Sequence, residues 1–89
     1  MNSSDLHVNF DAPAILYKWP SLNNERRPDV SSPYLLVDGT LDQCIREFMA
    51  KPAATRHLYE IHTSPQSLLV GAVLSGEVVA ELARLREFL

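Results

Sequence analysis

Cysteine is scarce in this chain: Cys44 is the single one among 89 residues, so no internal disulfide can form. Small secreted domains usually depend on several disulfides. The N-terminal segment also lacks the basic stretch followed by an apolar run that defines a secretory signal peptide. These absences favour a reducing compartment, and we expect a small, soluble, cytoplasmic protein of bacterial type.

Long apolar runs and basic clusters are missing as well. The longest mainly apolar run, residues 68–74, is far too short to cross a bilayer. Two arginines, Arg26 and Arg27, stand together beside Glu25, and the formal net charge is −3. Nucleic-acid binders draw most of their affinity from neutralising phosphates. We therefore expect no membrane and no nucleic acid among the partners.

Proline divides the chain near residue 33, because four of the six prolines lie before or at that point. We expect residues 1–33 to form a proline-rich, polar N-terminal arm, extended or partly disordered, and residues 34–89 to form one compact domain. Residues 14–19 lie between two prolines and are rich in β-formers. They are either an edge strand or an arm that becomes ordered only against a partner.

The clearest local signal lies at residues 34–50. Residues 34–37 form a short apolar run that predicts a buried strand, closed by Asp38 and Gly39. Thr40 and Gln43 then have the spacing of a capping box, which opens a helix over residues 41–50.

Residues 57–74 are ambiguous between strand and helix. As a strand, residues 57–63 place Tyr59 and Ile61 inward and leave Glu60 and His62 in solvent. Their β-branched and aromatic content favours the strand. The predicted fold is a small α+β domain with helices at about 41–50 and 76–88 and strands near 34–37 and 57–63. The alternative is an all-α domain of three or four helices.

The helix over residues 76–88 has a wider apolar surface than one small core requires. Ser75 is a suitable N-cap, and Leu74 and Val79 have the spacing of a hydrophobic staple. One broad face then carries a set of aliphatic residues: Val78, Val79, Leu82, Leu85 and Leu89. Phe88 projects away from this face, among charged residues.

Candidate catalytic and metal-binding groups are sparse. Cys44 with His57 or His62 is a conceivable nucleophile and base, but its helical position is typical of a buried structural cysteine. No ligand set has zinc spacing, and Asp38, Gly39 and Thr40 are explained by a turn and a cap. The carboxylates of the two helices, such as Asp42, are expected to be solvated. We therefore assign no catalytic, cofactor or metal site.

The sequence favours a non-catalytic interaction or regulatory module rather than an enzyme. We expect it to form a homodimer or to dock a protein partner through its C-terminal helix. The predicted contact residues come from that helix and from the N-terminal arm: Phe88, Leu89, Leu85, Tyr17 and Trp19. The alternatives are a small enzyme that uses Cys44 with a histidine and, with less support, a helix-turn-helix DNA binder.

Overall fold

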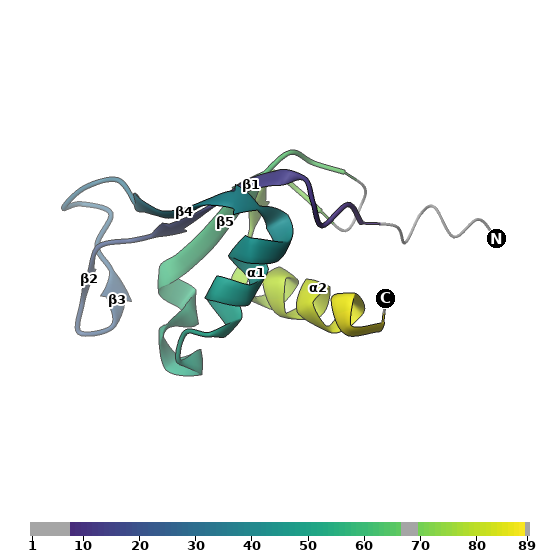
Figure 1. Ribbon diagram of the computed structural model, residues 1–89. Helices are drawn as coiled ribbons and strands as arrows, with labels where there is room; N and C mark the ends of the chain where they lie inside the picture. The colour runs from purple at the N-terminus through teal and green to yellow at the C-terminus, as the bar shows by residue number, and fades with distance from the viewer. Residues whose placement is uncertain (1–7, 67–69, 89) are drawn as a thin grey trace.

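The computed structural model describes residues 8–66 and 70–88, with Phe88 described by its backbone alone. Four antiparallel strands form a sheet in the order β4-β1-β5-β6, and the helices lie on one of its faces (Figure 1). The sheet and its helices confirm the predicted α+β class. The elements in chain order are β1 (Pro13–Lys18), β2 (Ser21–Leu22), β3 (Glu25–Arg26), β4 (Tyr34–Thr40), α1 (Leu41–Met49), the 3₁₀ helix η2 (Ala53–Leu58), β5 (Tyr59–Thr63), β6 (Val73–Leu74) and α2 (Gly76–Phe88).

The core lies between the sheet and the helices. Val37, Leu16, Ile61 and Leu74 pair across all four strands and form one row on the inner face. The largest side chains that are fully buried in the described part come from both layers: Phe48, Leu16, Leu41, Ile45, Ile61, Leu74, Val70, Val79 and Cys44. No helix in the described ranges is long and apolar enough to span a membrane.

β1 is an interior strand, paired with β4 on one side and β5 on the other. The edge position predicted for residues 14–19 is therefore wrong. Ala14 and Leu16 are buried in the core, so the N-terminal third of the chain contributes directly to the sheet. The predicted boundary near residue 33 separates two segments that share this sheet. Strand order is a non-local property, and composition carries no signal for it.

β4 confirms the strand predicted at residues 34–37, but the prediction that it is buried is wrong. Tyr34, Leu35 and Leu36 are 47%, 51% and 39% exposed. β4 is an edge strand, and its first half runs out beyond α1 (Figure 1). A bulge lies where Leu16 pairs with Val37 and Tyr17 pairs with Leu35. The helices therefore leave this half of the strand uncovered.

α1 begins with the predicted capping box. The backbone N–H of Gln43 donates to Thr40 Oγ1 at 3.1 Å. The backbone N–H of Thr40 donates in return to the side-chain oxygen Oε1 of Gln43 at 2.9 Å. A Cβ at Gly39 would lie 2.1 Å from that same Gln43 oxygen, so glycine leaves room for the box to close. The helix ends at Met49, with Ala50 as its C-cap.

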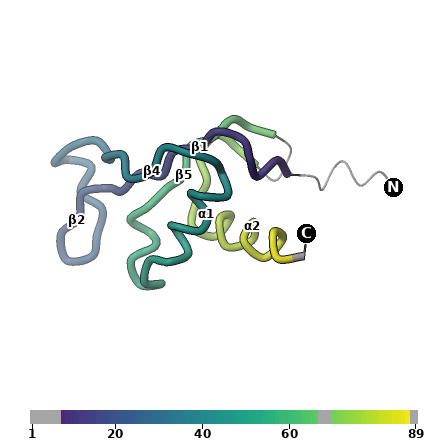
Figure 2. The backbone as a smooth tube through the Cα atoms, viewed as in Figure 1, coloured from purple at the N-terminus to yellow at the C-terminus, as the bar shows by residue number. Residues whose placement is uncertain are grey.

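A small hairpin, β2–β3, projects from the end of β1, away from α1 and α2 (Figure 2). Its turn residues, Asn23 and Asn24, have φ values of 53° and 63°. Two consecutive positive φ angles are typical of a type I′ turn, and asparagine adopts them readily. Side chains of the hairpin then reach back to the domain: Asn24 Nδ2 donates to the carbonyl of Ala54, and Arg26 Nε donates to the carbonyl of His57.

The ambiguous segment contains the strand that its composition favours. β5 forms after η2, with Tyr59 and Ile61 buried on the inner face as predicted. β6 pairs Leu74 with Ile61 and Val73 with His62. Residues 68 and 69 of the apolar run at 68–74 lie outside the described residues.

Candidate functional site

α2 is the element on which the predicted contact surface depends, and its start follows the local sequence. Val79 N donates to the carbonyl of Ser75 at 2.9 Å, and Val78 N lies 3.5 Å from Ser75 Oγ. Leu74 and Val79 are both buried, as a hydrophobic staple requires. The helix therefore starts in a defined place against the core.

An ion-pair cluster joins α2 to α1. Arg86 of α2 and Arg46 of α1 both contact the carboxylate of Asp42, whose side chain is 18% exposed. The prediction that Asp42 is solvated is wrong, because the packing of α2 on α1 covers it. One side of α2 thus carries Val79, Leu82 and Arg86 toward the rest of the domain.

A groove of about 720 Å³ runs along the adjoining side of α2. Its lining in the described part consists of Glu77, Val78, Ala80, Glu81, Leu82, Arg84 and Leu85. Val78 and Leu85 pack against the edge of the core but remain half-buried. Leu85 is therefore the one predicted contact residue of α2 whose side chain the structure describes. The side chain of Phe88 and the whole of Leu89 lie outside the described residues.

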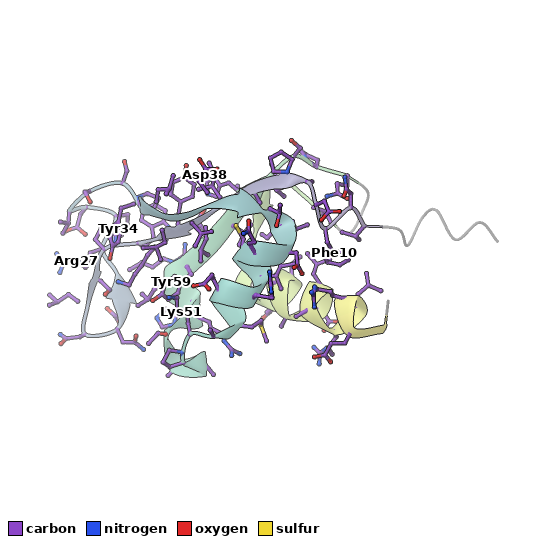
Figure 3. The ribbon with its side chains drawn as sticks, in the orientation of Figure 1. Phe10, Arg27, Tyr34, Asp38, Lys51 and Tyr59 are labelled. Carbon is purple, nitrogen blue, oxygen red and sulfur yellow. The ribbon has the colours of Figure 1, made fainter. Side chains whose placement is uncertain are left out.

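A second polar site lies on the outer face of the sheet, around Glu60. Pairing across the strands places two rows of side chains on this face. The first row consists of Asp38, Ile15, His62 and Val73. The next consists of Leu35, Tyr17 and Glu60. Figure 3 shows Asp38 on the side of the sheet away from the helices, whereas Tyr59 and Lys51 lie on the helix side.

The Glu60 carboxylate binds three side chains. Trp19 Nε1 donates to Glu60 Oε1, Arg26 Nη1 lies 3.3 Å from the same oxygen, and His62 Nε2 lies 2.7 Å from Oε2. Glu60 is 8% exposed, so the prediction that it is solvated is wrong. Burial alone would raise the pKa of Glu60, but hydrogen bonds from Trp19 and His62 and the charges of His62 and Arg26 outweigh it and lower the pKa.

Tyr17 and Trp19, the predicted contact residues of the arm, have partners within the molecule. The Tyr17 ring meets the His62 ring edge-on at 4.6 Å between centroids. Trp19 bonds Glu60, and the Arg26 guanidinium lies 5.5 Å from the centre of its ring. Both side chains are half-buried. The contacts of Arg26 with Trp19 and Glu60 tie the β2–β3 hairpin to the sheet. A contact role for either aromatic stays a prediction.

Cys44 lacks the properties of a reactive thiol. It is fully buried, and burial, with a smaller effect from the charge of Asp38, raises its pKa to about 11 from 9.0. A nucleophilic cysteine needs access and a lowered pKa. The environment of Cys44 is the one expected for a structural core residue.

The buried thiol predicts a specific loss of stability in alkali. Because the pKa of Cys44 is raised on folding, its stabilising effect is complete below about pH 9 and is lost as pH rises toward 11. We expect wild type to lose about 2 kcal/mol more between pH 8 and pH 10.5 than Cys44→Ala does. Urea unfolding of both proteins at both pH values measures the difference. Equal losses would contradict the buried, neutral thiol.

His57 and His62, the histidines within the described residues, belong to no ligand cluster. No group of three or more His, Cys, Asp or Glu side chains suited to a metal ion occurs among residues 8–66 and 70–88. His57 Nε2 lies 2.5 Å from the carbonyl of Asn24, and His62 is engaged by Glu60. In the turn before α1, the capping box accounts for Gly39 and Thr40.

Comparison of the chain with protein-family models, curated proteins and solved structures finds no match.

Sequence reasoning missed both polar clusters, those centred on Asp42 and Glu60. Arg86 lies 44 positions after Asp42, and Trp19 lies 41 positions before Glu60. A glutamate between the inward-facing Tyr59 and Ile61 is an ordinary exposed position in an isolated strand. The sequence held one signal for a partner of Glu60. Tyr17 and Trp19, two aromatic strand formers two positions apart, share one side of the segment at residues 14–19.

Proposed function

We propose that this protein is a non-catalytic interaction module that associates through α2, either with a second copy or with another protein. The observation that supports the proposal is the groove along α2, where Val78 and Leu85 remain half-exposed beside the buried Leu82. Partly uncovered aliphatic side chains at the edge of a core commonly mark contact surfaces. An 89-residue chain also buries a limited share of its surface, so association adds stability that its own core lacks.

The position of α2 favours it over other surfaces because the helix is fixed before any partner arrives. Its first turn is anchored by Leu74 and Val79, and its last described turns are tied to α1 by Arg86 and Asp42. A preorganised helix loses little conformational entropy on binding. The groove therefore offers a rigid surface.

The exposed first half of β4 is a second apolar surface, but it is less suited to binding a strand. At its bulge the pairing with β1 shifts by one residue, so the alternation of side chains between the two faces is broken there. Bulges are one of the devices that keep edge strands from pairing with other chains. We therefore assign the contact to α2.

The alternative functions have less support. A Cys44 enzyme would need a thiol that is accessible and acidic, and Cys44 is neither. A helix-turn-helix DNA binder would need basic or amide residues at the start of its recognition helix. α2 starts with Gly76 and Glu77 instead.

Replacing Leu85 with aspartate tests the proposal. A carboxylate at this position would be desolvated in any complex formed at the groove, so we expect the dissociation constant to rise at least tenfold. Analytical ultracentrifugation measures it, with circular dichroism to verify folding. Leu22→Asp is the matched control, because Leu22 is 55% exposed on the distant β2. Equal association of wild type, Leu85→Asp and Leu22→Asp would refute the assignment to α2.

A further inference from the structure

The guanidinium group of Arg26 has an acceptor for each of its three nitrogens. Nε donates to the carbonyl of His57 at 2.5 Å, Nη1 lies 3.3 Å from Glu60 Oε1, and Nη2 lies 3.5 Å from the carbonyl of Tyr59. The centre of the Trp19 ring is 5.5 Å from Arg26 Cζ. We call these three acceptors and the Trp19 ring the cradle. A planar cation with a separate acceptor for each nitrogen is held in a way that a compact ammonium group cannot reproduce.

The cradle belongs to the sheet and its approaches, and not to the hairpin that supplies the guanidinium. Pairing between β1 and β5 places Tyr59 and Glu60, and the backbone N–H of Trp19 donates to the carbonyl of Leu58 at 2.8 Å. Glu60 is 8% exposed, and His62 holds its second carboxylate oxygen at 2.7 Å. These constraints are independent of the hairpin, so the acceptors keep their places when the guanidinium leaves.

The β2–β3 hairpin has little apolar surface to hold it against the domain. Residues 21–26 are all exposed, and Leu22, its one apolar residue, is 55% exposed. Each of its strands has two residues, and an isolated two-stranded hairpin is marginally stable in water. Asn24 adds polar contacts with Ala54 and His57. A segment with few buried apolar contacts opens locally at a low free energy.

We infer that the cradle is a guanidinium-binding site that the chain fills with its own Arg26, so that the hairpin is a displaceable latch. The Arg26 side chain is 39% exposed, so solvent reaches the site. A guanidinium ligand, such as an arginine side chain of another protein, enters when the hairpin lifts and makes the same contacts. Arg26 competes with it as a tethered ligand, which lowers the apparent affinity in proportion to the time the latch is closed. The inference does not depend on association through α2.

Ethylguanidinium, which reproduces the end of an arginine side chain, tests the site in the Arg26→Ala variant. NMR titration of the Trp19 Nε1–H signal measures binding, and ethylammonium is the matched ligand with the same charge and no fork. We expect Arg26→Ala to bind ethylguanidinium with a dissociation constant of about 1–10 mM and ethylammonium at least about tenfold more weakly. Wild type should bind ethylguanidinium at least about tenfold more weakly than Arg26→Ala, because a latch that is open for about a tenth of the time imposes that factor. Arg27→Ala, which removes the neighbouring arginine paired with Asp29, should behave as wild type.

Three results would overturn the assignment of the site. They are equal binding of the two ligands by Arg26→Ala, equal binding of ethylguanidinium by Arg26→Ala and wild type, and undiminished binding when Glu60→Gln is added to Arg26→Ala. Circular dichroism of each variant verifies that it is folded.

Amide hydrogen exchange of wild type tests the latch itself. The backbone N–H of Arg27 donates to the carbonyl of Pro20 at 2.6 Å at the base of the hairpin, whereas Leu16 lies in the interior strand β1. We expect the Arg27 amide to exchange at least about tenfold faster than the Leu16 amide, because the hairpin opens while the sheet stays folded. Equal protection of the two amides would mean that the hairpin opens only with the whole fold, and it would overturn the latch.

Discussion

Replacing Glu60 with alanine is expected to lower the free energy of unfolding by about 3 kcal/mol. The substitution removes the acceptor of Trp19 and the counter-charge of Arg26 and His62. All three groups would then remain in or beside a buried site without their partner, and the cost of an orphaned polar group exceeds the gain from a typical hydrogen bond. The hairpin would also lose one of its attachments to the sheet.

Urea unfolding followed by the fluorescence of Trp19, the single tryptophan, measures this loss directly. Glu47→Ala is the control, because Glu47 is exposed on α1 and its removal should change stability by no more than about 0.5 kcal/mol. A loss at Glu60 no larger than that of the control would show that the carboxylate is not the centre of the cluster.

The Glu60 carboxylate also makes the free energy of unfolding depend on pH. Since the pKa of Glu60 is lowered on folding from its ordinary value of 4.5, its stabilising effect is present above about pH 4.5 and is lost as pH falls through the folded-state pKa. Wild type should therefore lose more stability on acidification than Glu60→Gln.

Replacing Phe48 with alanine should have the largest effect, a loss of about 3–5 kcal/mol. Phe48 is fully buried, and its ring meets the Tyr59 ring edge-on at 6.4 Å between centroids. A Cβ added at Gly76 would lie 3.3 Å from Phe48 Cζ, so the ring reaches the first residue of α2. The substitution would leave a cavity between α1 and the start of α2, which adds to the lost burial of the ring.

Thermal and urea unfolding of Phe48→Ala and Phe48→Leu test this prediction. Leucine keeps most of the volume, so it should cost about 1–1.5 kcal/mol. If both variants lost the same small amount, Phe48 would not be the residue that joins the two helices.

The parts of the fold that could be predicted are those with a local cause. The start of α1 depends on Thr40 and Gln43, three residues apart, and the start of α2 depends on Ser75, Leu74 and Val79. The interior place of β1 could not be predicted, because it depends on which strands pair across long stretches of chain. For the same reason the sequence indicated an exposed Glu60 and an exposed Asp42. Each is covered by a residue more than 40 positions away.

The contact role of the C-terminal helix stays a prediction. The helical repeat placed Val78, Val79, Leu82, Leu85 and Leu89 on one broad face, and in the structure Val79 and Leu82 are buried while Val78 and Leu85 lie half-buried along a groove. The repeat did not indicate that Arg86 faces the domain, because its partner Asp42 belongs to α1. The ion pair lies on the side of α2 that packs on α1, while Val78 and Leu85 remain at the edge of the core.

Association at the groove side of α2 can be measured directly. A dilution series of amide NMR spectra, from about 1 mM to about 10 µM, tests it residue by residue across the range expected for a small interface. Association through α2 predicts concentration-dependent shifts for residues 77–85, with none in the β2–β3 hairpin. Shifts confined to β4, or spectra that do not change with concentration, would contradict self-association through α2.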